Sequence, residues 1–213
     1  MRALPKLLTW LSPAFPVGAF AYSHGLEWAI QAGDVHDEAT LAEWLEDVLA
    51  HGAGRTDAIL LRHAYRARVE AELAAIAELA EAAQPCRERR TEALGQGAAF
   101  VLASAVWGGT RRETPVPYPV AFGALARAHD IPEDPATLGF LHAFAANLIS
   151  AAVRLIPLGQ TAGLRVLAGL EPIIEAIAAG TAPAGLDEIG GSCFRSDIAA
   201  MRHETQYTRL FRS

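Results

Sequence analysis

The sequence predicts an all-α fold, a single-domain bundle of about eight to ten helices, and three observations support this class. First, apolar residues recur at the spacing of a helical face in several segments, for example at Leu41, Trp44, Leu45, Val48 and Leu49. Second, prolines and glycines separate these segments, where they would end helices. Third, we find no series of alternating β-branched runs bounded by turns, which strands would require. Without an internal repeat or a boundary in charge, residues 1–213 are expected to form one domain.

Composition narrows the class of protein. Hydrophobic residues make up 52% of the 213 residues and charged ones 20%, which is enough apolar material for a sizeable core. A net charge of −6 argues against a nucleic-acid binder, which would carry a basic surplus. Cys86 and Cys193 form no CxxC pair, which excludes a cysteine zinc site within the chain. So few cysteines are also typical of a protein in a reducing cytoplasm. The sequence leaves undecided whether the two form a disulfide.

Three uncharged stretches have some features of targeting or membrane segments. The apolar run Leu7–Leu11 is too short for a signal peptide, and Ser12 and a proline follow it at once. The runs Ala93–Thr110 and Pro135–Val153 approach the length of a membrane span, but glycines or polar residues interrupt both. Buried helices explain them better, so no membrane partner is expected.

The first quarter of the chain predicts a packed loop followed by helices. Two prolines and two glycines within residues 10–27 favour a compact loop that leads into a helix at about Tyr22. Asp37 is a plausible N-cap for the helix that carries the Leu41 face, and Gly52 follows its end.

The middle of the chain predicts long helices and one extended linker. A single alanine-rich helix is expected from Thr56 to Ala83, because Pro85 is the first residue that would stop it. Arg87–Arg90 is expected to be a solvated face at the start of a helix that reaches about Trp107. Alternating prolines predict an extended linker at Arg111–Pro119.

The second half contains the most apolar helix. Pro119 suits the first turn of a helix that reaches about Ala128. The helix Leu138–Ile156 is apolar over so much of its circumference that it should be central or should also meet a second subunit. A further helix runs from about Leu164 to Gly180, and the Gly- and Pro-rich residues 181–192 predict a flexible connector.

Residues 197–213 predict a C-terminal helix and tail that bind a partner. The helix is expected to begin near Ser196 or Asp197, both reasonable caps. The tail combines arginines with exposed apolar residues such as Leu210 and Phe211, the composition of binding hot spots. Two alternatives remain at this point: the tail packs on its own domain, or it becomes ordered when it binds another protein.

Motifs for catalysis are missing. The sequence contains no GxxxxGK[ST], no GxGxxG after a strand, no GxSxG and no HExxH. His24 with Glu27 has helical spacing, and His203 with Tyr207 is an i, i+4 pair; structural contacts explain both better than metal ligation. We expect His142, in the most apolar helix, to be a hydrogen-bonded core residue. A binding protein without enzyme activity is favoured, and the alternatives are a helical metalloenzyme with His and Glu ligands or a helical regulator that binds a small ligand.

Four blocks of the sequence resemble a known family. They lie in the expected order at Ser12–Gly18, Ser23–Glu27, Ala151–Gln160 and Met201–Ser213. The chain resembles UreF, a family of urease accessory proteins, over nearly its whole length.

The resemblance implies an all-helical cytosolic chaperone without a cofactor. Proteins of this family form homodimers and bind the accessory protein UreD, also called UreH. The pair recruits the GTPase UreG, and the assembly helps to insert nickel into the urease apoprotein in a GTP-dependent step. From the matching blocks and the tail, the expected partner-binding residues are Tyr22, His24, Glu27, Gln160, Arg202, His203, Glu204, Tyr207, Arg209, Leu210, Phe211, Arg212 and Ser213.

Overall fold

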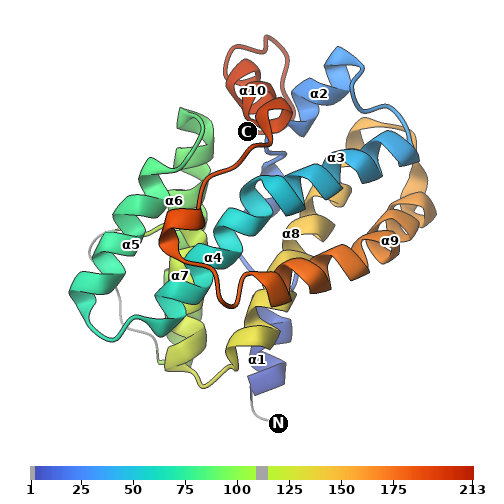
Figure 1. Ribbon diagram of the computed structural model, residues 1–213. Helices are drawn as coiled ribbons and strands as arrows, with labels where there is room; N and C mark the ends of the chain where they lie inside the picture. Colours follow the sequence, from blue (N-terminus) through green and yellow to red (C-terminus); the bar gives the residue numbers. More distant parts are fainter. Residues whose placement is uncertain (1–2, 109–114) are drawn as a thin grey trace.

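The computed structural model describes residues 3–108 and 115–213, and it confirms the all-α class. The described residues contain ten α-helices, three short 3₁₀ helices and no strand (Figure 1). The α-helices are α1 (Ala3–Trp10), α2 (Leu26–Ala32), α3 (Glu38–His51), α4 (Ala53–Arg66), α5 (Glu70–Ala82), α6 (Arg87–Ser104), α7 (Tyr118–Ala128), α8 (Glu133–Leu155), α9 (Gly159–Gly180) and α10 (Phe194–His203). The 3₁₀ helices are Ala19–Ala21, Ala105–Trp107 and Leu186–Glu188.

Two hydrophobic clusters share the interior, and α4 and α8 contribute to both. One cluster lies among α2, α3, α8 and α9, and the other lies among α1, α5, α6 and α7. Ala58 of α4 and Leu148 of α8 belong to the first cluster, whereas Leu61 and Phe140 of the same helices belong to the second. Figure 1 shows α3 and α9 on one side of these two helices and α5 and α6 on the other. Because α4 and α8 belong to both clusters, the two clusters form parts of one continuous core.

The N-terminal segment differs from the prediction. An unpredicted helix, α1, precedes the loop, and α2 begins at Leu26 rather than at Tyr22. The reason is local backbone geometry: His24 and Gly25 have φ angles of 57° and 79°. Left-handed residues end a right-handed helix, so no helix can run from Tyr22 through this point.

The single helix predicted at Thr56–Ala83 is wrong, because the chain turns between α4 and α5. The Glu72 carboxylate accepts hydrogen bonds from the backbone N–H groups of Arg68 and Val69 and caps α5. The turn has a packing consequence, since Leu61 and Leu73 belong to the same cluster. In a continuous helix, twelve residues would separate them by about 18 Å.

The most apolar helix, α8, is longer than predicted and begins at Glu133. Among the described residues, it is also the one helix long and apolar enough to cross a membrane, and half of its apolar stretch is buried inside the protein. Its burial against α4 and α9 accounts for this composition. The expectation for His142 is wrong: the side chain is exposed, because it lies on the outer side of α8.

The connector 181–192 runs along α4. Arg55 donates hydrogen bonds to the backbone oxygen and the carboxylate of Glu188, and His63 contacts the backbone oxygen of Ala184. These contacts attach the connector at several points, and its flexibility in solution stays a prediction. The linker predicted at Arg111–Pro119 lies partly outside the described residues, but Pro119 does occupy the first turn of α7.

Candidate partner-binding site

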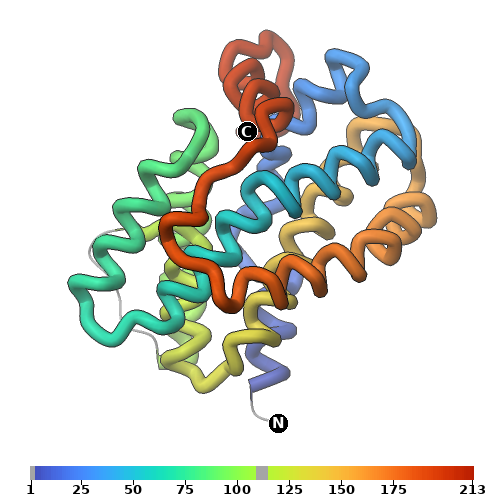
Figure 2. Tube along the Cα trace, viewed as in Figure 1, coloured from blue at the N-terminus to red at the C-terminus, as the bar shows by residue number. Residues whose placement is uncertain are grey.

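Helix α10 and the tail that follows it fold back against α2 and α6. Figures 1 and 2 show α10 beside α2, with the C-terminal residue lying between these helices and the bundle. Phe211 and Ser213 are only 5% and 1% exposed. Of the two alternatives that the sequence left open, the structure shows the first, because the tail packs on its own domain.

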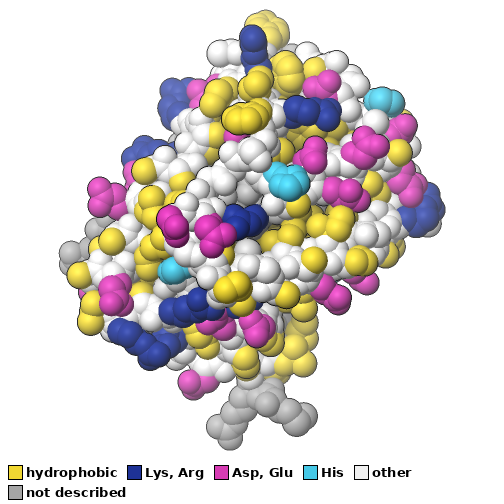
Figure 3. Space-filling model, viewed as in Figure 1, with side chains coloured by type: hydrophobic (Ala, Val, Ile, Leu, Met, Phe, Trp, Pro, Cys, Tyr) yellow, Lys and Arg dark blue, Asp and Glu magenta, His cyan; other side chains and the backbone are white. Residues whose placement is uncertain are grey.

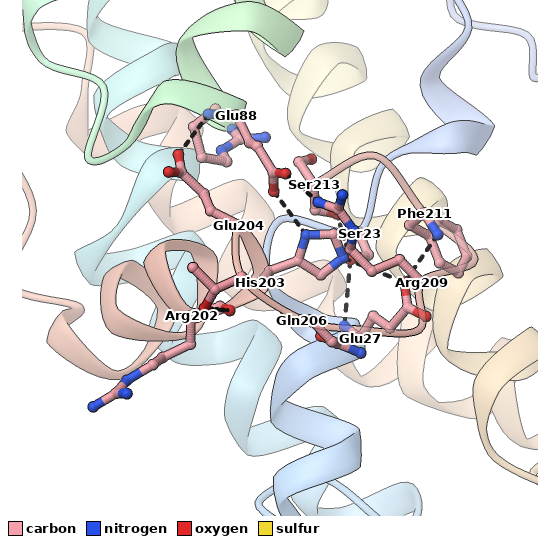
Figure 4. A network of polar contacts seen from close by, with 12 residues as sticks. Ser23, Glu27, Glu88, Arg202, His203, Glu204, Gln206, Arg209, Phe211 and Ser213 are labelled. Carbon is pink, nitrogen blue, oxygen red and sulfur yellow. Dashed lines mark hydrogen bonds and ion pairs between the residues drawn. The ribbon is translucent and has the colours of Figure 1, made fainter.

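The Glu27 carboxylate holds the middle of the tail. It accepts hydrogen bonds from the backbone N–H groups of Leu210 (2.7 Å) and Phe211 (2.9 Å), and its second oxygen lies 3.3 Å from Nε2 of His203 (Figure 4). Glu27 sits in the first turn of α2, which begins directly after the left-handed Gly25. A Cβ atom at Gly25 would overlap the backbone of Ala200, so this glycine allows α10 to approach Glu27 closely.

A second carboxylate, Glu88 at the start of α6, binds the other side of His203. Its oxygens lie 2.7 Å from Nδ1 of His203 and 2.6 Å from Nη1 of Arg209. In return, the backbone N–H of Glu88 donates to the carboxylate of Glu204, which follows α10. Because His203 is fully buried between Glu27 and Glu88, it joins α10 to both α2 and α6.

A third carboxylate, Glu92, binds the end of the tail. It accepts hydrogen bonds from the hydroxyl of Ser213 and from Nε2 of His24, both at 2.6 Å, and it pairs with Arg89. Burial alone would raise the pKa of Glu92, but the charge of Arg89 and the hydrogen bonds from His24 and Ser213 outweigh it and lower the pKa to about 2. A buried carboxylate with this many donors is a structural anchor.

Backbone and aromatic contacts complete the docking of the tail. The N–H and hydroxyl groups of Ser23 both donate to the backbone oxygen of Ser213, at 2.7 and 2.5 Å. The guanidinium of Arg154 lies 4.4 Å from the centre of the Phe211 ring and also donates to the backbone oxygen of Phe20. The tail therefore contacts α8 as well as α2 and α6.

The structure brings most of the predicted site residues together and leaves two apart. The residues that share hydrogen bonds, ion pairs or the ring contact described above are His24, Glu27, His203, Glu204, Arg209, Leu210, Phe211 and Ser213. Arg212 joins through its backbone N–H, which donates to Ala21. Arg202 and Tyr207 line a shallow cleft beside α2. Tyr22 lies in the preceding loop, and Gln160 is exposed in the first turn of α9, outside this network.

Sequence reasoning missed the acidic residues of α6. We expected Arg87–Arg90 to be solvated, yet the side chain of Arg89 is buried together with Glu92. The spacing did carry a signal: Arg89, Glu92 and Gln96 lie on the helical face that continues to the buried Phe100. Polar residues in register with a core residue indicate a buried network rather than a solvated face.

Apolar side chains remain exposed on the outer side of this region. Phe194, Ile198 and Met201 recur at i, i+4 and i+7 on α10, and Tyr207 and Leu210 follow in the tail. We call these five residues the α10 face. Figure 3 shows hydrophobic side chains, interspersed with Lys and Arg, over this part of the molecule. Several large exposed apolar side chains with arginines nearby are typical of a protein-binding site.

The depressed pKa of Glu92 leads to a first prediction. Because the charged form is stabilised in the fold, its contribution is present above the ordinary pKa of 4.5 and is lost as the pH falls toward about 2. The free energy of unfolding of the Glu92→Gln variant should therefore approach that of the unsubstituted protein as the pH is lowered from about 5 to about 2.5. Urea titrations across this range measure it, with the exposed Glu43→Gln as control. A difference that stays constant over this range would contradict the prediction.

The fold and the site together define an all-helical protein with an exposed apolar surface on α10 and the tail. The carboxylates of Glu27, Glu88 and Glu92 accept structural hydrogen bonds, and within residues 3–108 and 115–213 no group of three His, Cys, Asp or Glu side chains is placed to hold a metal ion. What the region offers to another molecule is a firmly held apolar surface.

Comparisons with known proteins identify the family. A family model described as UreF matches residues 35–171. The urease accessory protein UreF of Cereibacter sphaeroides (strain KD131 / KCTC 12085) is 55% identical over 99% of this chain and 99% of that protein. The proteins of the same description from Rhodopseudomonas palustris (strain BisA53) and Bradyrhizobium diazoefficiens are 51% and 52% identical over 99% of this chain, and cover 93% and 92% of their own lengths. The chain belongs to the UreF family of urease accessory proteins.

Proposed function

We propose that this protein is a cytoplasmic, non-catalytic chaperone of urease maturation that binds a UreD-like protein through the α10 face. In this proposal it connects that protein with a UreG-like GTPase for GTP-dependent insertion of nickel into the urease apoprotein. The observation that carries the proposal is an exposed apolar surface on α10 and on a tail that three carboxylates, two of them buried, hold in place. Family membership supports the assignment to urease maturation.

The α10 face has the chemistry of a binding hot spot. Tyr207 is fully exposed, and Leu210 and Phe194 keep more than half of their surface in contact with solvent. Burying an apolar side chain of this size returns about 1.5–3 kcal/mol. The exposed Arg202 can add hydrogen bonds to a carboxylate of the partner at the rim of the same surface.

The docked tail lowers the cost of binding. Ordering a free segment costs about 1–2 kcal/mol per backbone residue, and a preorganised surface avoids most of that loss. Glu27 and Glu92 hold Phe211 and Ser213, the buried residues that follow the exposed Leu210 in the chain. The affinity for the partner should therefore depend on these buried anchors as well as on the exposed side chains.

The GTPase activity belongs, in this proposal, to the partner. The chain lacks the GxxxxGK[ST] loop whose backbone cradles phosphates, although the process that we assign to it uses GTP. Its role is to position the GTPase.

Truncation of the tail tests the proposed partner site. Deleting residues 207–213 removes Tyr207 and Leu210 and also the groups that satisfy Glu27 and Glu92. We expect the helical circular dichroism signal to persist, the thermal transition to shift downward, and the capture of a UreD-like protein in a pull-down to be abolished. If the truncated chain still captures this protein, the α10 face is not its binding site. Loss of a cooperative thermal transition would instead show that the tail is part of the core.

A homodimer is expected through the outer side of α8. Leu138 and His142 are exposed on this helix, and Phe20 of the preceding loop is exposed beside its C-terminal half, where Arg154 contacts its backbone. Light scattering at tens of micromolar should give twice the chain mass of 22.7 kDa. The Phe20→Glu variant should give the monomer mass, because it places a charge in the interface. A monomer mass for the unsubstituted chain would contradict the proposal.

A further inference from the structure

A cavity of about 300 Å³ lies beneath the N-terminal loop, away from the α10 face. It is bounded by the loop that follows α1, by α6, by the start of α7 and by α8. Aromatic side chains supply much of its wall: Trp10, Phe15, Phe20, Tyr118, Phe140 and Phe144. A volume of this size and lining is in the range of small-molecule sites.

One end of the cavity is polar and contains a carboxyl group that lacks a partner. Asp57, His24, Arg89 and Glu92 line this end. The side chain of Asp57 forms no hydrogen bond or ion pair with any residue that the structure describes, although the charges of Arg89 and Glu92 act on it. Burial raises the pKa of Asp57 to about 7, so both of its protonation states are present near neutral pH.

His24 supplies a second unsatisfied group at the same end. Its Nε2 donates to the Glu92 carboxylate, and burial together with the charge of Arg89 lowers the pKa of the ring, so that the neutral form with a proton on Nε2 is favoured. Nδ1 then carries a lone pair and has no hydrogen-bond partner in the described part of the chain, although it is buried. The backbone of His24 is left-handed, with a φ angle of 57°. Strain and an unpaired buried group at one residue are features of binding sites.

We propose that this cavity binds a small amphipathic molecule with a flat apolar body and an uncharged head that donates a hydrogen bond. The body packs among the aromatic side chains, and the head lies near Asp57 and His24. Charge selects against the alternatives: a cationic head would lie near Arg89, and an anionic head would lie near Glu92. A hydroxyl group is the simplest head that can donate to either acceptor, and it can also accept from the protonated form of Asp57.

2-Naphthol is a suitable probe because it combines a two-ring body with one hydroxyl group and its fluorescence reports its environment. Saturable binding to one site per chain is expected when 2-naphthol is titrated with the full-length protein. Naphthalene, which lacks the donor, and 2-naphthoate, which carries a negative charge, should each bind about tenfold more weakly, the factor that corresponds to one net hydrogen bond. Absence of saturable 2-naphthol binding, or equal affinity for all three compounds, would overturn the proposal.

Two variants locate the probe. Ala146→Phe fills the cavity from α8 and should abolish binding, whereas Ala168→Phe, at an exposed position of α9, should leave it unchanged. Asp57→Leu should weaken binding of 2-naphthol about tenfold without weakening binding of naphthalene. Circular dichroism shows whether each variant is folded. If Ala146→Phe does not fold, the binding measured with Asp57→Leu tests the proposal. Unchanged affinity of a folded Ala146→Phe variant, or of Asp57→Leu, would place the probe elsewhere and refute the proposal.

Discussion

Replacing Glu27 with alanine is expected to release the tail from the domain and to weaken binding of a UreD-like partner by at least about a hundredfold. The carboxylate satisfies the backbone N–H groups of Leu210 and Phe211 and contacts the buried ring of His203. Each hydrogen bond to a charged group contributes about 1.5–3 kcal/mol, so two such bonds account for a hundredfold change or more. Without them, the exposed Leu210 side chain is no longer presented in a fixed position.

Two measurements separate release of the tail from loss of the fold. Hydrogen exchange should show the Leu210 and Phe211 amides losing protection, while the amides of α3 and α9 keep theirs. Calorimetric titration with the UreD-like protein measures the affinity. Glu27→Gln is the matched variant, because it keeps one acceptor oxygen and should retain an intermediate affinity. The exposed Glu43→Ala is the control for lost charge. Unchanged amide protection in Glu27→Ala would show that other contacts hold the tail.

Replacing Arg62 with methionine is expected to be the most destabilising of the substitutions considered. Arg62 is 1% exposed, and its guanidinium pairs with Glu133 at 2.7 Å and donates to the backbone oxygen of Ala178 at 2.6 Å. These contacts join α4 to the start of α8 and to the end of α9. Removing one partner of a buried pair costs about 3–5 kcal/mol. Glu133 would keep only its hydrogen bonds from Arg66, which is more exposed than Arg62.

Urea denaturation followed by circular dichroism measures this cost. A surface pair in the same protein is the matched control: Arg165 and Glu38 join α9 to α3 through two hydrogen bonds, and both are partly solvated. Arg165→Met should lower the free energy of unfolding much less than Arg62→Met does, because water screens an exposed pair. Equal losses for the two variants would mean that burial does not set the strength of the Arg62 pair.

Local sequence information was sufficient for the helices whose signals lie close together along the chain. Asp37 was predicted to cap the helix that carries Leu41, and in the structure Asp37 and Thr40 form a reciprocal capping box. The same kind of reasoning placed Pro119 in a first turn. It failed between α4 and α5, because nothing local to Thr56–Ala83 reveals that Leu61 and Leu73 share one cluster.

The candidate site was predicted only in part, because local sequence information does not show contacts between distant residues. The composition of the tail and its resemblance to UreF identified Phe211 and His203 as residues of interest, but they left open whether the tail is free or packed on the domain. The partners that hold the tail are distant in sequence: Glu27 lies 183 residues before Leu210, and Glu92 lies 121 residues before Ser213. In the sequence, Glu92 appears as one charge among several at the start of a helix.

By itself, the sequence determined the helical class, the family and the apolar, arginine-containing composition of the C-terminal end. Helical periodicity and capping depend on contacts three or four residues apart, which a single sequence displays directly. Only the tertiary structure decided that Glu27, Glu88 and Glu92 converge on the tail and that Asp57 and His24 share the end of a cavity. Helices pack through their apolar faces, and this packing also brings distant polar side chains together. The distance between two such residues along the sequence does not reveal that they will be neighbours in the fold.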